Sequence, residues 1–403
     1  MTKRERVEKT YGFGIPDRPP FVPAVYEHKA ALVGRTPSEV CRDGGLLHEA
    51  LLRELEIYDP DVLTVGIDVY NVEAEALGCR VRYFEDSNDV PAVASPLLGG
   101  AGGVKGRAFG SPLARGLYPR ASTAEVDPRA KPGAGLPSPG PGKAGAGLPS
   151  PGPGKAGAPA AVDELKVPDP ESDGRMPLFL ETAGRLHREL GSEVRVRGAV
   201  SGPFSLACAL MGTEEVLVGT ADDPASIARL LDFCGRVTVA YGKAFRAKGV
   251  DVAIFDSKAS PGAASPRIFH DLVLPVYRDL VMPGLSAAGA RPVPLIIGGD
   301  TTPILDDLLL TGATQLLCDA GADLEAFKKR CREERRAFRV SVDARLIHRG
   351  RPDEIRAEAL RLLGATAGQP GLLFGCGVVA YDTDPANVLA LRAALDEFSA
   401  GIS

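Results

Sequence analysis

Acidic side chains recur where apolar stretches of this sequence end. If these stretches are strands, the acidic side chains could act together on a bound molecule. Asp68 follows the apolar stretch 62–67, Asp256 closes 252–257, and Asp300 follows 293–299. A carboxylate can move a proton or bind a cation. One such aspartate would be an ordinary helix cap. Five aspartates at five such ends favour a ligand site that includes Asp68 and Asp256, whereas helix capping is favoured for Asp319 and Asp343.

Two glutamates follow the second apolar stretch, in the segment "YNVEAEALGC". In an extended segment Glu73 and Glu75 would face the same side, and one of them could act as a base or ligand. The alternative is a solvated pair. We predict catalytic roles for Asp68, Glu75 and Asp256.

A second group of polar and glycine residues also ends or follows apolar stretches. The segment "VPLIIGGDTTPIL", 293–305, combines a strand pattern, a glycine turn and a helix start at Thr302-Pro303. Cys376 stands between two glycines, which let a backbone or a ligand approach closely. Substrate contacts are therefore predicted for His28, Tyr70, Ser201, Gly298, Gly299 and Asp300, and a metal contact for Cys376.

The elements that must position these residues are short apolar strands separated by helical patterns. Most of the strands lack strict alternation, which is typical of parallel strands covered on both faces. They number eight, and the segment 79–85 is predicted to form a side hairpin. The eight stretches are 21–26, 62–67, 194–200, 252–257, 293–299, 314–319, 338–343 and 371–376.

Eight strands alternating with helices predict an α/β fold, a single (β/α)8 TIM barrel. A doubly wound open sheet is the competitor, but no GxGxxG turn follows the first strand. The segment 97–161 carries two copies of "GAGLPSPGPGKA" and is rich in Gly, Pro and Ala, which predicts a disordered insertion. The barrel is thus expected in two parts, 1–96 and 162–403.

Composition narrows the class of protein. The net charge of −5 with no basic block gives no reason to expect nucleic acid as a partner, and no apolar run approaches a membrane-spanning length. The seven cysteines form no CxxC pair, which indicates reduced thiols. The expected protein is a cytoplasmic enzyme with a small-molecule substrate and no membrane partner.

Seven segments in order make the chain resemble the uroporphyrinogen decarboxylase superfamily, over almost everything except the insertion. They include "VLTVGIDVYNVEAEALG", "VSGPFSLACALMG", "GGDTTPILDDLLLTGATQLLCD" and "FGCGVVAYDTDPAN". The resemblance implies a single (β/α)8 barrel. It also implies one of two activities: decarboxylation of a tetrapyrrole, or methyl transfer between a corrinoid and a thiol.

Two segments of this sequence can be compared with the motifs of these two branches of the superfamily. The decarboxylase branch carries an arginine-rich segment after its first strand, and here that segment reads "YEHKAAL". In the methyltransferase branch zinc is held by a His-x-Cys-Gly segment and a later cysteine. Cys376 matches the later cysteine, whereas Ile296, Ile297, Gly298 and Gly299 stand in place of the first ligands.

The resemblance therefore favours corrinoid-linked methyl transfer to or from a small molecule, with a non-standard metal site. A corrinoid or tetrapyrrole is expected as the substrate or as a group carried by a corrinoid protein, and a homodimer remains open. The alternatives are a decarboxylase that converts uroporphyrinogen III to coproporphyrinogen III, and a binding barrel without catalysis.

Overall fold

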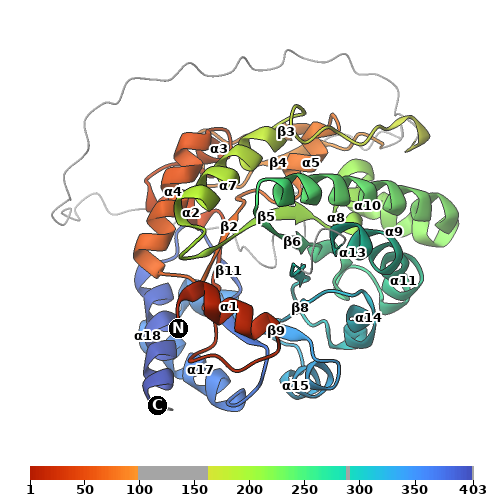
Figure 1. Cartoon of the computed structure of the whole chain (residues 1–403). Coiled ribbons are helices and arrows are strands. Elements are labelled where there is room, and N and C mark those ends of the chain that lie inside the picture. Colours follow the sequence, from red (N-terminus) through yellow and green to blue (C-terminus); the bar gives the residue numbers. More distant parts are fainter. Residues whose placement is uncertain (99–161, 287–290, 402–403) are drawn as a thin grey trace, which may run out of the picture. The chain divides into compact units, whose positions relative to one another are not determined.

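The computed structural model describes residues 1–98, 162–286 and 291–401, in which strands and helices alternate along the chain (Figure 1). They belong to one compact unit, Met1–Gly100 with Pro159–Ser403. A second unit, Ala101–Ala158, lies outside the described residues. The predicted insertion 97–161 also lies outside them, except for its first two residues.

All eight predicted strands are present, some shorter than expected. The side hairpin is confirmed as well, with antiparallel β3 (Arg80–Arg82) and β4 (Ala92–Ser95). The eight are β1 (Ala24–Val25), β2 (Val62–Val65), β5 (Arg195–Ser201), β6 (Asp251–Phe255), β7 (Leu295–Ile296), β8 (Gln315–Cys318), β9 (Ala337–Val342) and β10 (Leu372–Cys376). A further short strand, β11 (Val378–Val379), follows β10 and was not predicted.

The strands of the central layer pair in parallel, as expected for an α/β fold. One sheet has the order β2-β5-β6-β7 and another β10-β9-β8, while β1 pairs with β11. Single parallel bridges link Pro294 to Gln315 and Phe21 to Phe374. The N–H of Asp61 donates to the carbonyl of Phe21 at 2.9 Å, which joins the first strand to the start of β2.

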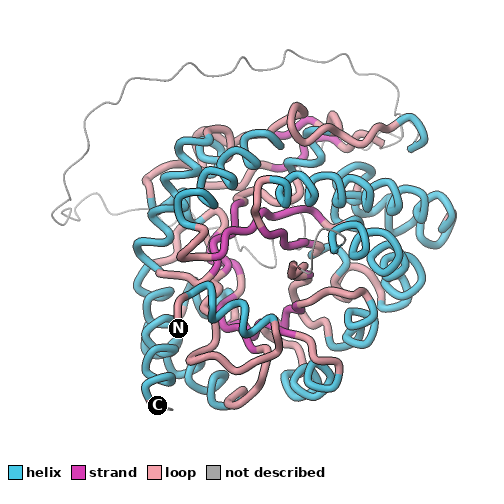
Figure 2. The backbone as a smooth tube through the Cα atoms, in the orientation of Figure 1, coloured by secondary structure: helices cyan, strands magenta, loops and turns pink. Residues whose placement is uncertain are grey.

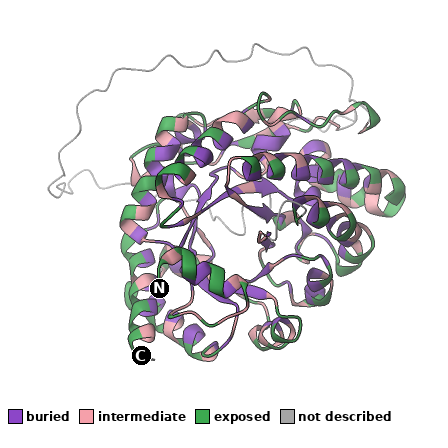
Figure 3. Ribbon diagram, viewed as in Figure 1, coloured by how far each residue is buried: buried purple, intermediate pink, exposed green. Residues whose placement is uncertain are grey.

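Helices surround these strands, as Figure 2 shows, and their inner faces are buried in Figure 3. No single described helix is long and apolar enough to cross a membrane, although α8 with α9 passes as a bent pair by length and composition only. The main helices are α1 (Lys3–Tyr11), α2 (His28–Leu32), α3 (Pro37–Val40), α4 (Gly44–Tyr58), α5 (Asn71–Ala76), α7 (Met176–Leu190), α8 (Pro203–Met211), α9 (Thr213–Asp222), α10 (Pro224–Ala247), α14 (Leu305–Leu310), α15 (Leu324–Glu333), α16 (Ala344–Arg349), α17 (Pro352–Ala365) and α18 (Pro385–Ala400). Residues 266–286 form one irregular helical stretch made of α11 (Pro266–Ile268), α12 (Leu274–Val276), α13 (Met282–Ser286) and two π-helical turns, Phe269–Val273 and Tyr277–Val281.

Side chains divide between the two faces of the strands because successive residues point to opposite sides. The outward residues form the main core against the helices. The inward residues, together with Val7 of α1, form two smaller groups. The carboxyl-end cluster is Ala24, Tyr26, Ala253, Phe255, Ile296 and Leu317, and the amino-end cluster is Val7, Val22, Val62, Ala337 and Leu373.

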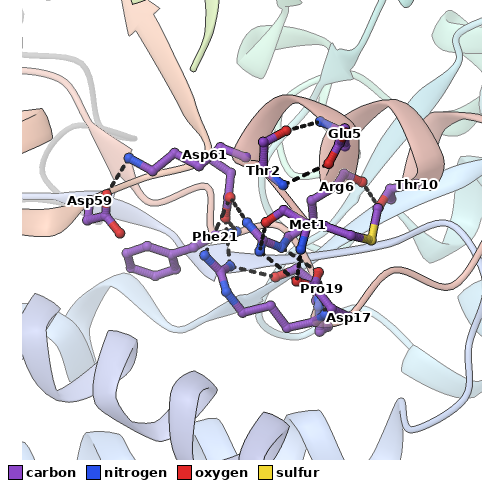
Figure 4. Close-up of polar contacts among 12 residues, drawn as sticks. Met1, Thr2, Glu5, Arg6, Thr10, Asp17, Pro19, Phe21, Asp59 and Asp61 are labelled. Atoms are coloured by element: carbon purple, nitrogen blue, oxygen red, sulfur yellow. Dashed lines mark hydrogen bonds and ion pairs between the residues drawn. The ribbon is translucent and has the colours of Figure 1, made fainter. Parts of the chain in front are cut away.

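Helix α1 is fixed at the amino ends of the strands by an ion-pair network around Asp61 (Figure 4). The fully buried Asp61 carboxylate accepts from Arg6 at 2.6 Å, from Arg18 at 2.7 Å and from the N–H of Phe21 at 2.6 Å. Arg6 also pairs with Asp17 at 2.8 Å. Three donors on one buried carboxylate compensate for its loss of hydration.

A buried lysine completes the contact between the first strand and β2. The ammonium of Lys29, which is fully buried, donates to the carbonyls of Thr64 and Gly66, each at 2.9 Å. It also lies 3.5 Å from a carboxylate oxygen of Glu54, which is 2% exposed. A side chain thus supplies donors to the edge of β2.

The Lys29–Glu54 pair predicts a specific pH dependence of stability. Burial raises the pKa of Glu54 from 4.5 to about 7, although Lys29 opposes this rise. The folded protein therefore holds this proton more tightly than the unfolded chain does. Its contribution to the free energy of unfolding should fall as the pH rises from about 4.5 to about 7.

Urea unfolding across this pH range checks the prediction. Because other buried carboxyls titrate as well, the quantity of interest is the difference between the unaltered chain and Glu54→Gln. As the pH rises from about 4.5 to about 7, the unaltered chain should lose stability relative to Glu54→Gln. Parallel profiles for the two proteins would contradict the assignment.

Candidate active site

Residues after the carboxyl ends of β2, β5, β6, β7 and β8 surround the carboxyl-end cluster, whose surface is apolar. Tyr26 and Phe255 meet edge to face there, with ring centroids 5.6 Å apart. Asp68, Tyr70, Ser201, Asp256 and the 298–300 turn all follow or end these strands. In parallel α/β folds this end of the strands is where ligands bind.

Asp68 is held in a network that the sequence did not suggest. Arg175, which directly precedes α7, donates to both Asp68 oxygens at 3.1 and 2.7 Å and also pairs with Glu75. The hydroxyl of Tyr83 donates to the second Glu75 oxygen at 2.7 Å. Burial raises the pKa of Asp68, and the Arg175 guanidinium opposes that rise. Asp68 and Glu75 are thus brought together by one arginine, which binds Asp68 through Nη1 and Nη2 and Glu75 through Nε.

Glu73 and Glu75 do not face the same side, contrary to the expectation for an extended segment. Both lie on helix α5, where residues two apart point in different directions. Glu73 is 1% exposed and accepts from the N–H of Ser201 at 2.6 Å, and burial raises its pKa. Glu73, rather than Glu75, is the glutamate that reaches β5.

Asp256 lies at the amino end of α8. Its buried carboxylate accepts from the N–H groups of Phe204 and Ser205, at 3.4 and 2.6 Å, and from the Tyr277 hydroxyl at 2.6 Å. Burial raises the pKa of Asp256, and these hydrogen bonds oppose the rise. Any side chain at Gly202 would collide with Asp256 and Tyr277, which explains the glycine before "PFS". No sequence pattern indicated Tyr277.

Tyr70 is held in a strained backbone conformation beside the carboxyl-end cluster. Its φ of 89° is in the left-handed region, which costs a non-glycine residue about 1–3 kcal/mol. The Tyr70 hydroxyl donates to Oγ of Ser257 at 2.9 Å and accepts from its N–H at 3.3 Å. These hydrogen bonds hold the Tyr70 ring between the ends of β2 and β6.

The glycine turn after β7 is tied to the end of β8. The N–H of Gly299, which has φ of 84°, donates to Asp319 at 2.9 Å. Asp300 is exposed, and its carboxylate accepts from the N–H of Thr302 at 3.0 Å. The predicted helix start at Thr302 is a short 3-10 turn, Thr302–Ile304, followed by α14. Asp343 caps α16 as expected, whereas Asp319 binds this turn.

His28 and Cys376 lie among packed side chains. His28 is 1% exposed; its Nδ1 lies 3.0 Å from the Tyr381 carbonyl and its Nε2 2.7 Å from the Tyr58 hydroxyl. Burial lowers the pKa of His28. Cys376 is fully buried in the main core with Phe374, on the helix-facing side of β10.

Zinc does not fit the residues that the structure describes. Burial raises the pKa of the Cys376 thiol to about 11, so the thiol stays protonated near neutral pH. Among the described residues, no group of three or more His, Cys, Asp or Glu side chains could hold a metal ion. Structural and catalytic zinc sites need at least three protein ligands.

Comparisons with known proteins identify the family. The family model described as uroporphyrinogen decarboxylase (URO-D) matches residues 2–105 and 146–398, so the chain belongs to that family. A uroporphyrinogen decarboxylase from Syntrophotalea carbinolica is 31% identical over 54% of this chain and 63% of its own length. The methylcobamide:CoM methyltransferase MtbA from Methanosarcina acetivorans is 29% identical over 54% of this chain and 62% of its own.

These relatives represent two activities, and the aligned part of the chain spans less than two thirds of each of them. Among solved structures, a methyltransferase from Methanosarcina mazei superposes with a TM-score of 0.74 and 20% identity, covering 99% of both chains. At that identity the likeness shows the fold, an α/β fold of parallel strands.

Proposed function

We propose that the eight parallel strands close into a (β/α)8 barrel whose mouth is formed by the carboxyl-end cluster and the residues around it. Contacts at the three junctions between the sheets support closure: the Pro294–Gln315 and Phe21–Phe374 bridges and the Asp61–Phe21 hydrogen bond. The superposition on the Methanosarcina mazei methyltransferase supports the same fold.

We infer that this mouth catalyses corrinoid-linked methyl transfer to or from a small molecule, in the cytoplasm. The observation that carries this proposal is the charge of the mouth. Asp68, Glu73, Asp256, Asp300 and Asp319 lie around it, and the guanidinium of Arg175 is already bound by two carboxylates. Arg175 is therefore not available for bidentate pairing with the carboxylates of a tetrapyrrole, which argues against that substrate.

Within this proposal the corrinoid supplies or accepts the methyl group, and the chain's residues bind and orient the small molecule. The apolar surface of Tyr26 and Phe255 suits a flat ligand or a methyl group and excludes water. Asp256 is the best-placed proton acceptor, because its three donors fix its orientation and its raised pKa favours proton transfer nearer neutral pH. No step is assigned to a metal ion.

Asp256→Asn tests this role, since asparagine keeps the shape of the side chain but not its charge. We expect turnover to fall about 10²–10⁴-fold. Urea unfolding measures the stability lost because the amide nitrogen, which cannot accept, faces a donor. The measurement is the absorbance change of methylcobalamin, incubated with the purified chain and a thiol such as CoM. Equal rates for Asp256→Asn and the unaltered chain would remove Asp256 from the mechanism, and no demethylation by either would count against methyl transfer.

The second candidate is decarboxylation, which the 31% identical Syntrophotalea carbinolica relative favours. Incubation with uroporphyrinogen III under reducing conditions, followed by chromatography for coproporphyrinogen III, distinguishes it. Conversion in this assay, without demethylation of methylcobalamin, would replace the methyl-transfer proposal. Corrinoid binding without either reaction would instead support a non-catalytic binding barrel.

A further inference from the structure

The three described donors to the Asp256 carboxylate divide unequally between its two oxygens. Oδ2 accepts from the Tyr277 hydroxyl at 2.6 Å and from the N–H of Phe204 at 3.4 Å. Oδ1 accepts from the N–H of Ser205 at 2.6 Å. A carboxylate oxygen accepts about two hydrogen bonds. Among the described residues, both positions on Oδ2 are therefore taken, whereas Oδ1 keeps one position for a further proton or donor.

Tyr277 reaches Asp256 from the irregular helical stretch, and both side chains are fully buried. Tyr277 begins the π-helical turn Tyr277–Val281, which ends two residues before Pro283. The proline ring would clash with the preceding turn of a regular helix, which accounts for the wider turn. Packing accounts for the aromatic ring, because phenylalanine would fill nearly the same volume. The hydroxyl is left to explain, and its described hydrogen bond is the one to Asp256.

The other titratable groups in this region are neutral phenols and thiols and one lysine. They are Tyr70 after β2, Tyr277, Cys208 of α8, Cys234 of α10 and Lys258, which follows Asp256 by two positions and interacts with Cys208. Burial raises the pKa of the phenols and thiols, that of Cys208 to about 12. Tyr277 therefore keeps its proton around neutral pH and acts as a donor, and Asp256 is the group of this set whose charge changes as the pH falls.

We propose that Tyr277 is a positioning residue: its hydroxyl holds Oδ2 of Asp256, so that Oδ1 is the atom that accepts a proton from the small molecule. The inference rests on the proton-accepting role proposed above for Asp256. In that step the bond between the proton and the small molecule breaks, a bond to Oδ1 forms, and the electron pair stays on the small molecule. The same hydrogen bond stabilises the charged carboxylate and so opposes the effect of burial.

Tyr277→Phe tests the inference, because it removes the hydroxyl and retains the ring. NMR of the full chain, isotope-labelled at the aspartate carboxyl carbons, follows the titration of Asp256, whose signal is the one absent from Asp256→Asn. We expect the midpoint to rise by about one to two pH units, the equivalent of one hydrogen bond to a charged group. Tyr11→Phe is the control. It loses a hydroxyl bond to Gln315 near the amino-end cluster and should leave the midpoint unchanged.

The demethylation assay gives a second readout. For Tyr277→Phe, kcat should fall about tenfold or more with little change in KM, because the proton acceptor is less well oriented and not because binding is lost. The acid limb of kcat/KM should move to higher pH, since Asp256 then stays protonated to a higher pH. Tyr11→Phe should keep the profile of the unaltered chain.

An Asp256 midpoint that does not move in Tyr277→Phe, or that rises equally in Tyr11→Phe, overturns the inference. If Tyr277→Phe does not fold, a ring-fluorinated tyrosine at this position keeps the hydroxyl and makes it a stronger donor. The midpoint should then fall, and a constant midpoint would count against the inference. Absence of demethylation by the unaltered chain would overturn methyl transfer, whereas a raised midpoint in Tyr277→Phe would still support control of Asp256 by Tyr277.

Discussion

Replacing Arg175 with methionine should lower the free energy of unfolding by about 3–5 kcal/mol, the usual cost of removing one partner of a buried ion pair. Methionine retains much of the volume but leaves Asp68, whose side chain is fully buried, without a cation. Glu75 and the carbonyl of Cys41 lose a donor as well. Because the network joins the end of β2 to the start of α7, we also expect loss of activity.

The pH dependence of this loss of stability distinguishes the effect of the uncompensated Asp68 carboxylate from the effect of lost packing around Arg175. Without Arg175 the pKa of Asp68 rises further, so its proton binds more tightly in the folded chain than in the unfolded one. The deficit in urea unfolding should therefore be larger at pH 7 than at pH 4. Adding Asp68→Asn to Arg175→Met should restore part of the stability. An equal deficit at both pH values, or no rescue, would show that lost packing dominates.

Replacing Lys29 with methionine should be comparably costly, again about 3–5 kcal/mol. The change leaves the carbonyls of Thr64 and Gly66 without their donor and leaves Glu54 buried beside an apolar side chain. Urea unfolding at pH 7 measures the loss. Without Lys29 the pKa of Glu54 rises further, so folding at pH 7 requires this carboxyl to take up a proton. A second change, Glu54→Gln, should recover part of the loss, because glutamine is already neutral.

The control for Lys29 is Lys9→Met, an exposed lysine on α1 that has no described ion pair. It should change the free energy of unfolding by no more than about 0.5 kcal/mol. If Lys29→Met is equally mild, the ammonium is not needed at the edge of β2, and water serves the two carbonyls instead.

The sequence was sufficient to place the strands, because runs of Val, Ile and Leu bounded by Gly and Asp mark buried parallel strands. It also placed Asp68, Ser201, Asp256 and Asp300 after or at strand ends, as the structure does. Their roles in catalysis or binding remain predictions. Local sequence patterns indicate where a strand or helix lies, because hydrophobic periodicity depends only on residues close together in the chain.

Partners far apart in sequence could not be predicted in this way. Asp68 and Arg175 are separated by 107 positions, and no pattern near either of them indicates the pair. Nothing in the segment "VRVRG" shows that Arg197 is buried at 3% exposed, with its Nε donating to Thr64. The expectation that Glu73 and Glu75 face the same side is wrong, because a helix, not an extended segment, follows β2. Side-chain environment depends on tertiary packing, which overrides these local signals.

The pairing of the first strand with β10 and β11 has a consequence for synthesis. Phe21 pairs with Phe374 and Ala24 with Val378, so the strand at 21–26 finds these neighbours only after residues 374–378 have been synthesised. Until then its unpaired edge is open to association with other chains. Asp61 and Lys29 come from the first 61 residues, so their contacts can hold that strand against β2 during elongation.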